Sequence, residues 1–392
     1  MTKSTSINPK KIENYSINGS SLNYEVEDFP FQINSFPKKY KVSCIKNIDQ
    51  YISLLRTADF IIIDKKVKEL YPIPSDLKSI IFTVEAKEEN KTLDTVLELI
   101  NEFIRENISK GNKVIAIGGG IIQDITACAC ALFRRGQPFS YLPTTTLGQL
   151  DSCVGAKCAV NTSNAKNILG LFSAPKEVII PMFTINTMPI LEHRAGLSEM
   201  LRLCITASSS AIEEYLNLLP YIIKPNNCNL DDYEKALKLS LSIKKSVVDF
   251  DEYEIDVRRS MNYGHTFGHS IEKLSNFKIP HGLAVLLGIQ IANKFSCSKK
   301  FMDEEIFQKI SMAIKSTLKE CNGDFSFLNH INPSDIVDQF KFDKKGDGES
   351  VPLIIINKPG DMIFYKHYFS SNRIDIVESI KDSIGKFIEW AK

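Results

Sequence analysis

The chain has 392 residues, which corresponds to about two or three domains of ordinary size. Lys and Arg number 48 and Asp and Glu 47, so the formal net charge is +1. A near-neutral chain without long blocks of one charge argues against nucleic acid or an anionic membrane as its main partner. With 43% hydrophobic and 24% charged residues, the composition excludes disordered, collagen-like and amyloid-type chains.

Features of membrane and secreted proteins are missing from the sequence. No stretch approaches the roughly 18 consecutive apolar residues of a membrane span. Residues 1–19 lack the apolar core of a secretory signal and are predicted to form a solvated lead-in. Nine cysteines without a C-x-x-C pair indicate reduced thiols and a cytoplasmic protein. Five of them are interpreted as small buried side chains: Cys128, Cys130, Cys153, Cys158 and Cys204.

The first half of the chain alternates short β-branched runs with amphipathic helical stretches. Strands are predicted at residues 60–64, 79–84, 113–117, 139–142 and 178–180. Continuous apolar strands separated by helices, such as residues 92–108, are typical of a parallel sheet covered on both faces. The first half is therefore predicted to be an α/β, Rossmann-like domain.

From residue 189 the apolar pattern becomes helical. Helices are predicted at residues 189–217, 230–248, 258–276, 281–297 and 303–319, with a short strand pair at residues 351–356 and 362–365. We place the boundary near residue 186, which predicts an α/β domain over residues 1–186 and a mainly α-helical domain over residues 187–392.

A glycine-rich turn, Gly118-Gly119-Gly120, follows the predicted strand KVIAI and opens a helix that continues through Gln123 and Asp124. Glycines let the backbone approach a pyrophosphate, and a helix start offers free N–H groups. The turn lacks the third glycine of G-x-G-x-x-G, so a tight turn without a ligand is the alternative.

A second polar group follows the predicted strand FSYL. Thr144 and Thr145 lie at the carboxyl end of this strand, where α/β sheets bind ligands. Residues 151–170 then hold lysines and amides among small residues, which suits a phosphate or hydroxyl-rich ligand: Asp151, Lys157, Asn161, Lys166 and Asn167. A helix cap and a solvated loop are the alternatives.

Three of the six histidines fall within 17 residues. His265 and His269 are four residues apart and share one helical face, and His281 follows after a turn. With Glu199 from an apolar helical stretch, they form a candidate three-ligand metal site with an open position. Spacing does not decide which of the histidines bind.

A run of polar residues leads into the histidines and is predicted to be helical: Lys244, Lys245, Asp251, Glu252, Glu254, Arg258, Arg259 and Asn262. Such a run is often a solvated face, but its position next to the candidate metal site favours a function.

At these motifs the chain resembles the 3-dehydroquinate synthase family, within the wider sugar-phosphate cyclases. The resemblance covers about residues 40–360 and rests on GGGIIQD, RRGQPFSYLPTTTLGQLDSCVGAKCAVN, KNILGLF, AGLSEM and RRSMNYGHTFGH, with the later His281-Gly282. It implies NAD in the α/β domain and a divalent metal in the helical domain, zinc in most members and cobalt as an alternative.

The resemblance also implies roles for individual residues. The implied metal ligands are Glu199, His265 and His281. The implied NAD contacts are Glu88, Lys91, Gly119, Gly120, Asp124, Thr144 and Thr145. The implied catalytic residues are Lys157, Lys244, Glu254, Arg258, Asn262 and His269. Further substrate contacts are Arg135 across a dimer interface, Asp151, Lys166, Asn167, and Lys344 or Lys345.

The implied reaction converts 3-deoxy-arabino-heptulosonate 7-phosphate to 3-dehydroquinate and phosphate. It proceeds by transient oxidation with NAD, phosphate elimination, reduction and intramolecular aldol closure. Arg258 and Lys244 are candidates for the substrate carboxylate, because a guanidinium suits a planar oxyanion. The resemblance further implies a homodimer acting on a small molecule in the cytoplasm, without nucleic acid or membrane.

Three positions depart from the family pattern. Gln123 replaces a glycine, Arg202 replaces a lysine, and Leu283 replaces a glutamate that commonly follows the metal-binding His-Gly. These departures keep open a sister cyclase acting on sedoheptulose 7-phosphate or glucose 6-phosphate. A metal-dependent polyol dehydrogenase and a non-catalytic binding homologue are further alternatives.

Overall fold

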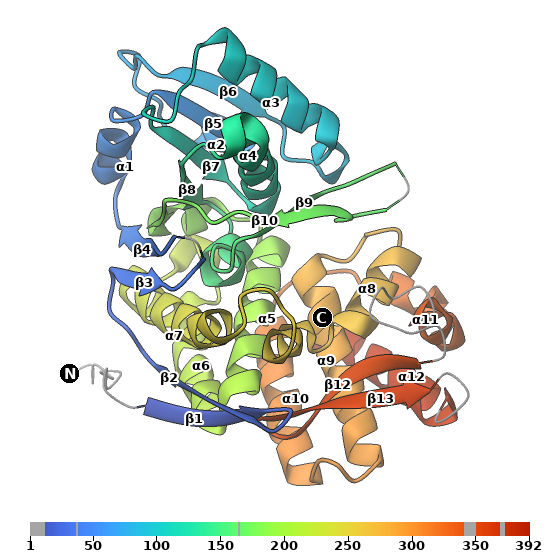
Figure 1. Ribbon diagram of the computed structural model, residues 1–392. Coiled ribbons are helices and arrows are strands. Elements are labelled where there is room, and N and C mark those ends of the chain that lie inside the picture. The colour runs from blue at the N-terminus through green and yellow to red at the C-terminus, as the bar shows by residue number, and fades with distance from the viewer. Residues whose placement is uncertain (1–11, 37, 164, 341–349, 369–372) are drawn as a thin grey trace, which may run out of the picture. The chain divides into compact units, whose positions relative to one another are not determined.

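The structure is a computed structural model that describes residues 12–36, 38–163, 165–340, 350–368 and 373–392 (Figure 1). The chain divides into two compact units. Residues 27–188 and 226–241 form one, called the sheet unit, and the described parts of residues 1–26, 189–225 and 242–392 form the helical unit. The prediction of an NAD-binding domain over residues 1–186 and of a metal- and substrate-binding domain over residues 187–392 stays a prediction.

The sheet unit is built on a mainly parallel sheet. Its strands, in chain order, are β3 (Phe31–Ile33), β4 (Tyr40–Ile45), β5 (Phe60–Asp64), β6 (Ile80–Val84), β7 (Val114–Gly118), β8 (Phe139–Pro143), β9 (Lys157–Val160), β10 (Leu169–Phe172) and β11 (Glu177–Pro181). Seven of them pair in the order β3-β4-β11-β8-β7-β5-β6, with only β3 antiparallel to its neighbour. β9 and β10 form a separate hairpin. The five predicted strands are confirmed.

Helices cover both faces of this sheet, which explains why the central strands β5, β7 and β8 are almost entirely buried. The helices are α1 (Ile48–Leu55), α2 (Lys65–Leu70), α3 (Leu93–Arg105) and α4 (Gly120–Leu132). On one face, Ile61 and Ile63 of β5 pack in a buried cluster with Tyr51 of α1. On the other, the ring of Phe60 lies 4.9 Å from that of Phe103 on α3. In Figure 1, α3 and α4 lie side by side over the strands.

The helical unit contains most of the remaining helices. They are α5 (Ile190–Ala207), α6 (Ser209–Ile222), α8 (His265–Leu274), α9 (His281–Ser298), α10 (Glu304–Leu318), α11 (Pro333–Gln339) and α12 (Arg373–Trp390). A further helix, α7 (Leu230–Phe250), begins in residues of the sheet unit and ends in residues of the helical unit. The α/β and mainly helical classes predicted for the two halves are confirmed.

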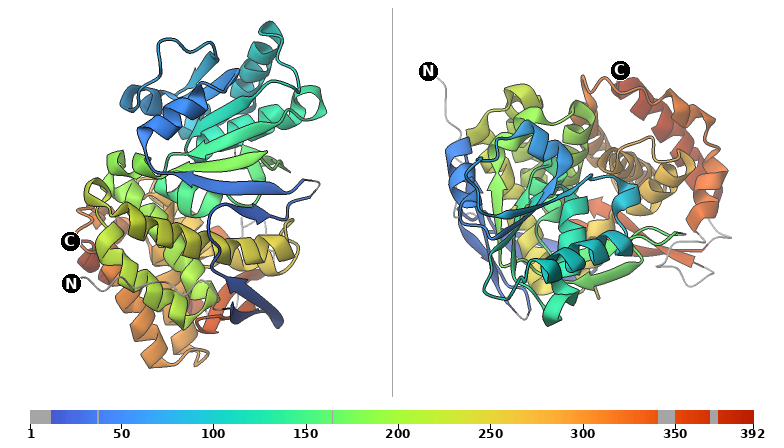
Figure 2. Two further views of the ribbon diagram at one scale, coloured as in Figure 1. Left: turned by 90° about the vertical axis from the view of Figure 1, so that its left-hand side faces the viewer. Right: turned by 90° about the horizontal axis from the view of Figure 1, so that it is seen from above.

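Residues 12–19 differ from the predicted solvated lead-in, because residues 12–17 form a strand, whereas residues 1–11 lie outside the described residues. β1 (Ile12–Ile17) and β2 (Ser20–Glu25) form a hairpin that joins β12 (Ser350–Lys358) and β13 (Asp361–Tyr368) in the order β12-β13-β1-β2. Figures 1 and 2 show the dark-blue strands next to the red ones. Tyr15 and Ile17 are buried and alternate with the exposed Asn14 and the partly exposed Ser16, so the pairing covers their apolar side chains.

Two predicted helices are divided in the structure. Residues 189–217 break at Ser208, whose extended backbone ends α5 and whose Oγ accepts a hydrogen bond from the N–H of Ala211 at the start of α6. Residues 258–276 contain a short 3-10 helix and then Gly264, whose φ of 80° stops helical continuation before α8. The predicted helices at 230–248, 281–297 and 303–319 and the late strand pair are confirmed.

The structure also bears on the predictions about the cysteines and about membrane spans. All nine cysteines are free thiols, and the five interpreted as buried fillers are buried. Among the described residues, none of the helices combines the length and the apolar character needed to cross a membrane.

The buried helix α9 touches α8 at backbone distance. A Cβ placed on Gly288 of α9 would lie 2.0 Å from the carbonyl oxygen of Gly264, which immediately precedes α8. No side-chain movement relieves a clash with backbone, so the two helices would have to separate.

We therefore predict that Gly288→Ala lowers the free energy of unfolding by about 2–3 kcal/mol or more, the cost of overpacking a tight core. The matched control is Gly385→Ala in α12, where the added methyl meets no atom within 4 Å. This control should stabilise the helix by roughly 0.5–1 kcal/mol. Thermal or urea unfolding measures both changes, and equal stability of the two variants would contradict the prediction.

Candidate functional site

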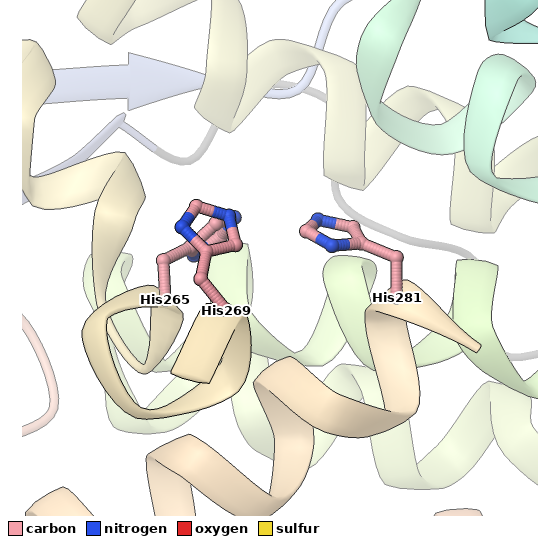
Figure 3. A group of neighbouring side chains, drawn as sticks. All are labelled: His265, His269 and His281. Atoms are coloured by element: carbon pink, nitrogen blue, oxygen red, sulfur yellow. The ribbon is translucent and has the colours of Figure 1, made fainter. Parts of the chain in front are cut away.

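Three histidines meet at the starts of two neighbouring helices of the helical unit. His265 is the first residue of α8, His269 lies one turn later, and His281 is the first residue of α9. One ligand nitrogen from each lies within 4.8 Å of the other two. Figure 3 shows the three rings turned toward one another. Imidazole nitrogens at this spacing are typical ligands of a transition-metal ion such as zinc.

A buried carboxylate from a third helix adjoins this group. Glu199 lies on α5 and is 1% exposed. Its Oε1 is 3.5 Å from Nε2 of His281 and 4.0 Å from Nε2 of His265. No described group donates a hydrogen bond to this oxygen. A buried carboxylate oxygen without a donor is costly, so the residues fit a divalent cation as the missing partner.

Two sets of metal ligands are compatible with this geometry, and both contain His265 and His281. The third ligand is either Glu199, as the family resemblance implies, or His269. The Glu199 side chain is buried, whereas His269 is exposed. The choice of Glu199 stays a prediction.

Arg202 holds the carboxylate in place. Its Nε donates to Oε2 of Glu199 at 2.6 Å, one helical turn away, and both side chains are 2% exposed. The guanidinium therefore neutralises Oε2, while Oε1 faces the histidines. Removal of one partner from a buried ion pair of this kind strongly destabilises the fold, because the other charge stays buried without compensation. Arg202, which stands where the family pattern has lysine, thus holds Glu199, a candidate metal ligand, in place.

A second carboxylate lies on the far side of His281. Oε2 of Glu272, on α8, is 3.0 Å from Nδ1 of His281. Burial disfavours the imidazolium, but the hydrogen bond and charge of Glu272, with the charge of Glu199, raise the pKa of His281 to about 9. Leu283, where a glutamate is common in the family, is fully buried in α9. The carboxylate beside His281 therefore comes from α8 instead.

The prediction of one polar helix over residues 244–262 is wrong. α7 ends at Phe250, and a loop then leads to a 3-10 helix, Val257–Asn262. Asp251 organises the loop, because its carboxylate accepts three backbone hydrogen bonds of 2.8–3.0 Å, from Ile255, Asp256 and Arg258. Burial would raise the pKa of Asp251, but these three donors lower it below its usual range.

This loop gathers three of the predicted catalytic residues. Nδ2 of Asn262 donates to Oε1 of Glu254 at 2.6 Å. The side chain of Arg258 is 4% exposed and donates to the carbonyl oxygen of Glu252. Lys244 lies on the last part of α7 and is 8% exposed. Arg258 and Lys244 are buried cations, a state that favours pairing with an anion.

In the sheet unit, the glycine turn lies next to Thr144, because the two follow neighbouring parallel strands. Gly118 pairs with Pro143 across β7 and β8, and the N–H of Thr144 donates to the carbonyl oxygen of Gly118 at 2.9 Å. Gly119 is the N-cap of α4 and provides no side-chain cap. The first turn of α4 therefore offers N–H groups to an anion.

A polar network links three of the residues predicted to contact NAD with Asn167, a predicted substrate contact. Nζ of Lys91 forms an ion pair with Asp124 of α4 and donates to Oδ1 of Asn167 at 2.6 Å. Burial raises the pKa of Asp124 even though the Lys91 ammonium opposes this change. Nδ2 of Asn161 donates to Oε1 of Glu88 at 2.8 Å, and Oδ1 of Asn161 accepts from the N–H of Asn167. Glu88, Lys91, Asp124 and Asn167 thus form one group.

Gln123 does not occupy the glycine turn. Its side chain is 7% exposed, and its Nε2 donates to the carbonyl oxygen of Ser152 at 3.1 Å. Ser152 ends the π-helical turn Gly148–Ser152, which also carries the buried Asp151. Gln123, which replaces the glycine of the family pattern, therefore links α4 to the turn that carries Asp151, a predicted substrate contact.

The remaining predicted residues lie on exposed segments or outside the described residues. Lys157 begins β9, and Lys166 lies in the connection to β10. Arg135 follows α4 with a φ of 59° and is exposed. Lys344 and Lys345 lie outside the described residues.

Three contributors to these groups escaped site assignment from the sequence. The sequence places Asp251 in a charged run and gives it no role of its own, although an aspartate is a common turn residue. Asn161 belongs to the polar group that suits a ligand, but the sequence assigns it no individual role. Glu272 lies seven residues after His265, on the same helical face, which is the signal that could have indicated it.

Together, the fold and the site define a class of protein: an α/β unit with a glycine turn at a helix N-terminus and a helical unit that gathers histidines and a buried carboxylate. Sequence comparison narrows this class. The family model "3-dehydroquinate synthase N-terminal" matches residues 81–195, and "3-dehydroquinate synthase C-terminal" matches residues 196–346. The chain belongs to the 3-dehydroquinate synthase family.

Similar curated proteins carry the same family name. A 3-dehydroquinate synthase of Campylobacter hominis is 33% identical over 285 residues, covering 72% of this chain and 79% of that protein. A 3-dehydroquinate synthase of Acetivibrio thermocellus is 34% identical over 278 residues, covering 71% of this chain and 75% of that protein.

Solved structures share the fold. A 2-deoxy-scyllo-inosose synthase complexed with carbaglucose-6-phosphate, NAD+ and Co2+ has a TM-score of 0.75 at 22% identity, covering 90% of this chain and 99% of that one. A 2-epi-5-epi-valiolone synthase from Streptomyces hygroscopicus with NAD+ and Zn2+ has a TM-score of 0.73 at 19% identity, covering 91% and 100%. A probable glycerol dehydrogenase from Sinorhizobium meliloti has a TM-score of 0.56 at 11% identity, covering 89% and 96%.

We predict that Asp251→Ala loosens the loop over residues 251–262, because three backbone N–H groups lose their acceptor. The free energy of unfolding should fall by about 1–3 kcal/mol, and amide exchange should rise within this loop. The control Asp382→Ala removes a partly exposed carboxylate next to Lys386 and should change stability by less than about 1 kcal/mol.

The difference in unfolding free energy between wild type and Asp251→Ala should depend on pH. Since the folded-state pKa of Asp251 is lowered, its stabilisation is present above the ordinary aspartate value of 3.8 and is lost as the pH falls through the folded-state value. The difference between wild type and Asp251→Ala should therefore shrink on acidification. A difference that stays constant from neutral pH into strong acid would contradict this role.

Proposed function

We propose that this protein is a 3-dehydroquinate synthase-like cyclase that converts 3-deoxy-arabino-heptulosonate 7-phosphate to 3-dehydroquinate and phosphate. It would be a carbon–oxygen lyase that depends on NAD and a divalent metal. The observation that carries the proposal is the buried Oε1 of Glu199, which lacks a hydrogen-bond donor among the described residues and faces His265 and His281. Membership of the family supports the reaction.

The proposed metal ligands are Glu199, His265 and His281, with zinc or cobalt as the ion. The similar solved structures that contain NAD+ with Co2+ or with Zn2+ support this pair of cofactors. When bound, NAD would accept and return the electrons of one substrate alcohol, and the metal would lower the pKa of that alcohol. His269, which is exposed beside His265, is then available for the phosphate or for a proton.

The proposed substrate contacts in the helical unit come from the loop after α7 and from α7 itself. Arg258 and Lys244 would bind the substrate carboxylate, because both cations are buried and a guanidinium matches a planar oxyanion. Glu254 would stay oriented through its hydrogen bond from Asn262. These side chains would bind and orient the substrate without rearrangement of the loop that Asp251 holds.

The proposed NAD contacts lie in the sheet unit. The N–H groups of Gly119 and Gly120 at the start of α4 would bind the pyrophosphate, with the hydroxyls of Thr144 and Thr145 nearby. Glu88, Lys91 and Asp124 would orient the rest of the cofactor. Further substrate contacts from this unit are proposed to be Asp151, Lys157, Lys166 and Asn167, with Arg135 from a second copy in a homodimer.

A sister sugar-phosphate cyclase is the second candidate. The observation that favours it is Arg202, whose guanidinium is bound to Glu199 where the family has lysine. A lysine at this position would present an ammonium group, whereas the guanidinium of Arg202 is bound to Glu199. The two residues therefore offer different groups to a substrate. A polyol dehydrogenase is a weaker third candidate, and a cytoplasmic location stays a prediction.

The first test of substrate class is phosphate release. We expect the purified, metal-loaded protein with catalytic NAD to release phosphate from 3-deoxy-arabino-heptulosonate 7-phosphate, with 3-dehydroquinate formed and no build-up of NADH. Release from sedoheptulose 7-phosphate or glucose 6-phosphate alone would instead indicate a sister cyclase. Accumulation of NADH with a simple polyol would indicate a dehydrogenase.

The carboxylate role is tested by Arg258→Ala. Loss of a charged hydrogen bond should reduce kcat/KM for a carboxylate substrate roughly 30-fold or more, while NAD affinity stays unchanged. The matched control is Arg259→Ala, which removes the neighbouring exposed guanidinium and should leave turnover intact. Equal loss of turnover and of NAD affinity in Arg258→Ala would mean that the residue is structural.

A further inference from the structure

Glu272 lies where it can act on the candidate metal site without binding the metal. It is on α8, three residues after His269, and its side chain is 15% exposed. Its Oε2 is 3.0 Å from Nδ1 of His281, while Nε2 of the same ring is 3.5 Å from Glu199. His281 is therefore placed between two carboxylates, one at each ring nitrogen.

These contacts define the tautomer of His281 that can bind a metal. A carboxylate is only an acceptor, so Nδ1 must carry the hydrogen in the contact with Glu272. The neutral ring then has its lone pair on Nε2, which faces Glu199 and the other histidines. A histidine whose second nitrogen donates to a carboxylate is held in orientation and is a more basic ligand.

The backbone of Glu272 is itself held in place. Its carbonyl oxygen accepts from the N–H of Phe277 at 2.7 Å and from Oγ of Ser275 at 3.0 Å. These bonds close the last turn of α8, so the carboxylate projects from a capped helix end. The contact with His281 then depends on the tight packing of α8 against α9.

We propose that Glu272 is a positioning residue for the metal ligand His281: by accepting the Nδ1 hydrogen, it sets the tautomer and orientation of the ring and strengthens metal binding at Nε2. The proposal rests on the proposed metal site and deepens it. Glu272 supplies from α8 the carboxylate that Leu283 does not provide from α9.

The test measures metal affinity of the full chain rather than activity. Zn2+ binding is followed by competition with a chromophoric chelator, and Co2+ binding by its visible absorption. Glu272→Ala should weaken Zn2+ binding about 10–100-fold and change the Co2+ spectrum, since the ring of His281 becomes free to turn. Glu272→Gln keeps an acceptor oxygen and should recover part of the affinity. The control Glu305→Gln, an exposed acid on α10, should bind metal as wild type does.

A double-mutant cycle decides whether Glu272 acts through His281. In the His281→Ala background, Glu272→Ala should cause no further loss of metal affinity, because the contact is already absent. Additive losses would overturn the proposal, as would wild-type affinity in Glu272→Ala. A fall in the Tm of the metal-free protein that accounts for the weaker binding would also overturn it, because the role would then be structural.

The outcomes separate this proposal from the proposed function. A wild-type protein that binds no divalent metal would overturn both the metal site and the role of Glu272. A protein that binds metal and responds to Glu272→Ala, but releases no phosphate from any of the three sugar phosphates, would support the role of Glu272 and reject the cyclase.

Discussion

The site in the helical unit depends on backbone contact between three helices. A Cβ on Gly282 of α9 would lie 2.0 Å from the carbonyl oxygen of Ala195 on α5, and Gly288 meets the segment before α8 at the same distance. Ligand side chains are short, so groups on three helices reach one ion only where the backbones nearly touch. The glycines that permit this contact therefore help to bring Glu199, His265 and His281 together.

Charge balance explains why the carboxylate can lie in the core. An isolated buried carboxylate is very unfavourable, but Arg202 compensates Oε2 of Glu199 at 2.6 Å. The other oxygen is left facing two histidines, an arrangement completed by a cation or by a proton on the histidines. The ion pair with Arg202 therefore also holds in place the carboxylate that is proposed as a metal ligand.

In the sheet unit the site follows from strand register. Pairing of Gly118 with Pro143 places the glycine turn and the threonines at one edge of the sheet. Gln149 supports this edge, because its buried Nε2 donates to the carbonyl oxygens of Pro143 and Pro181. Gln123 adds a link from α4 to Ser152. The backbone at this edge is thus held in place by the side chains of Gln123 and Gln149.

The sequence by itself determined five strands of the mainly parallel sheet, most helices, the glycine turn and the histidine group, because these follow from periodicity and from residues close together in the chain; it did not indicate β3 and β4. It did not reveal that β1 joins β13, since this pairing links residues more than 300 apart. Nor did it reveal the break at Ser208, where the apolar pattern continues across the helix end. Only the tertiary structure decided that Glu272 meets His281 and that Asp251 closes its loop, because such contacts depend on how packed helices and turns direct individual side chains.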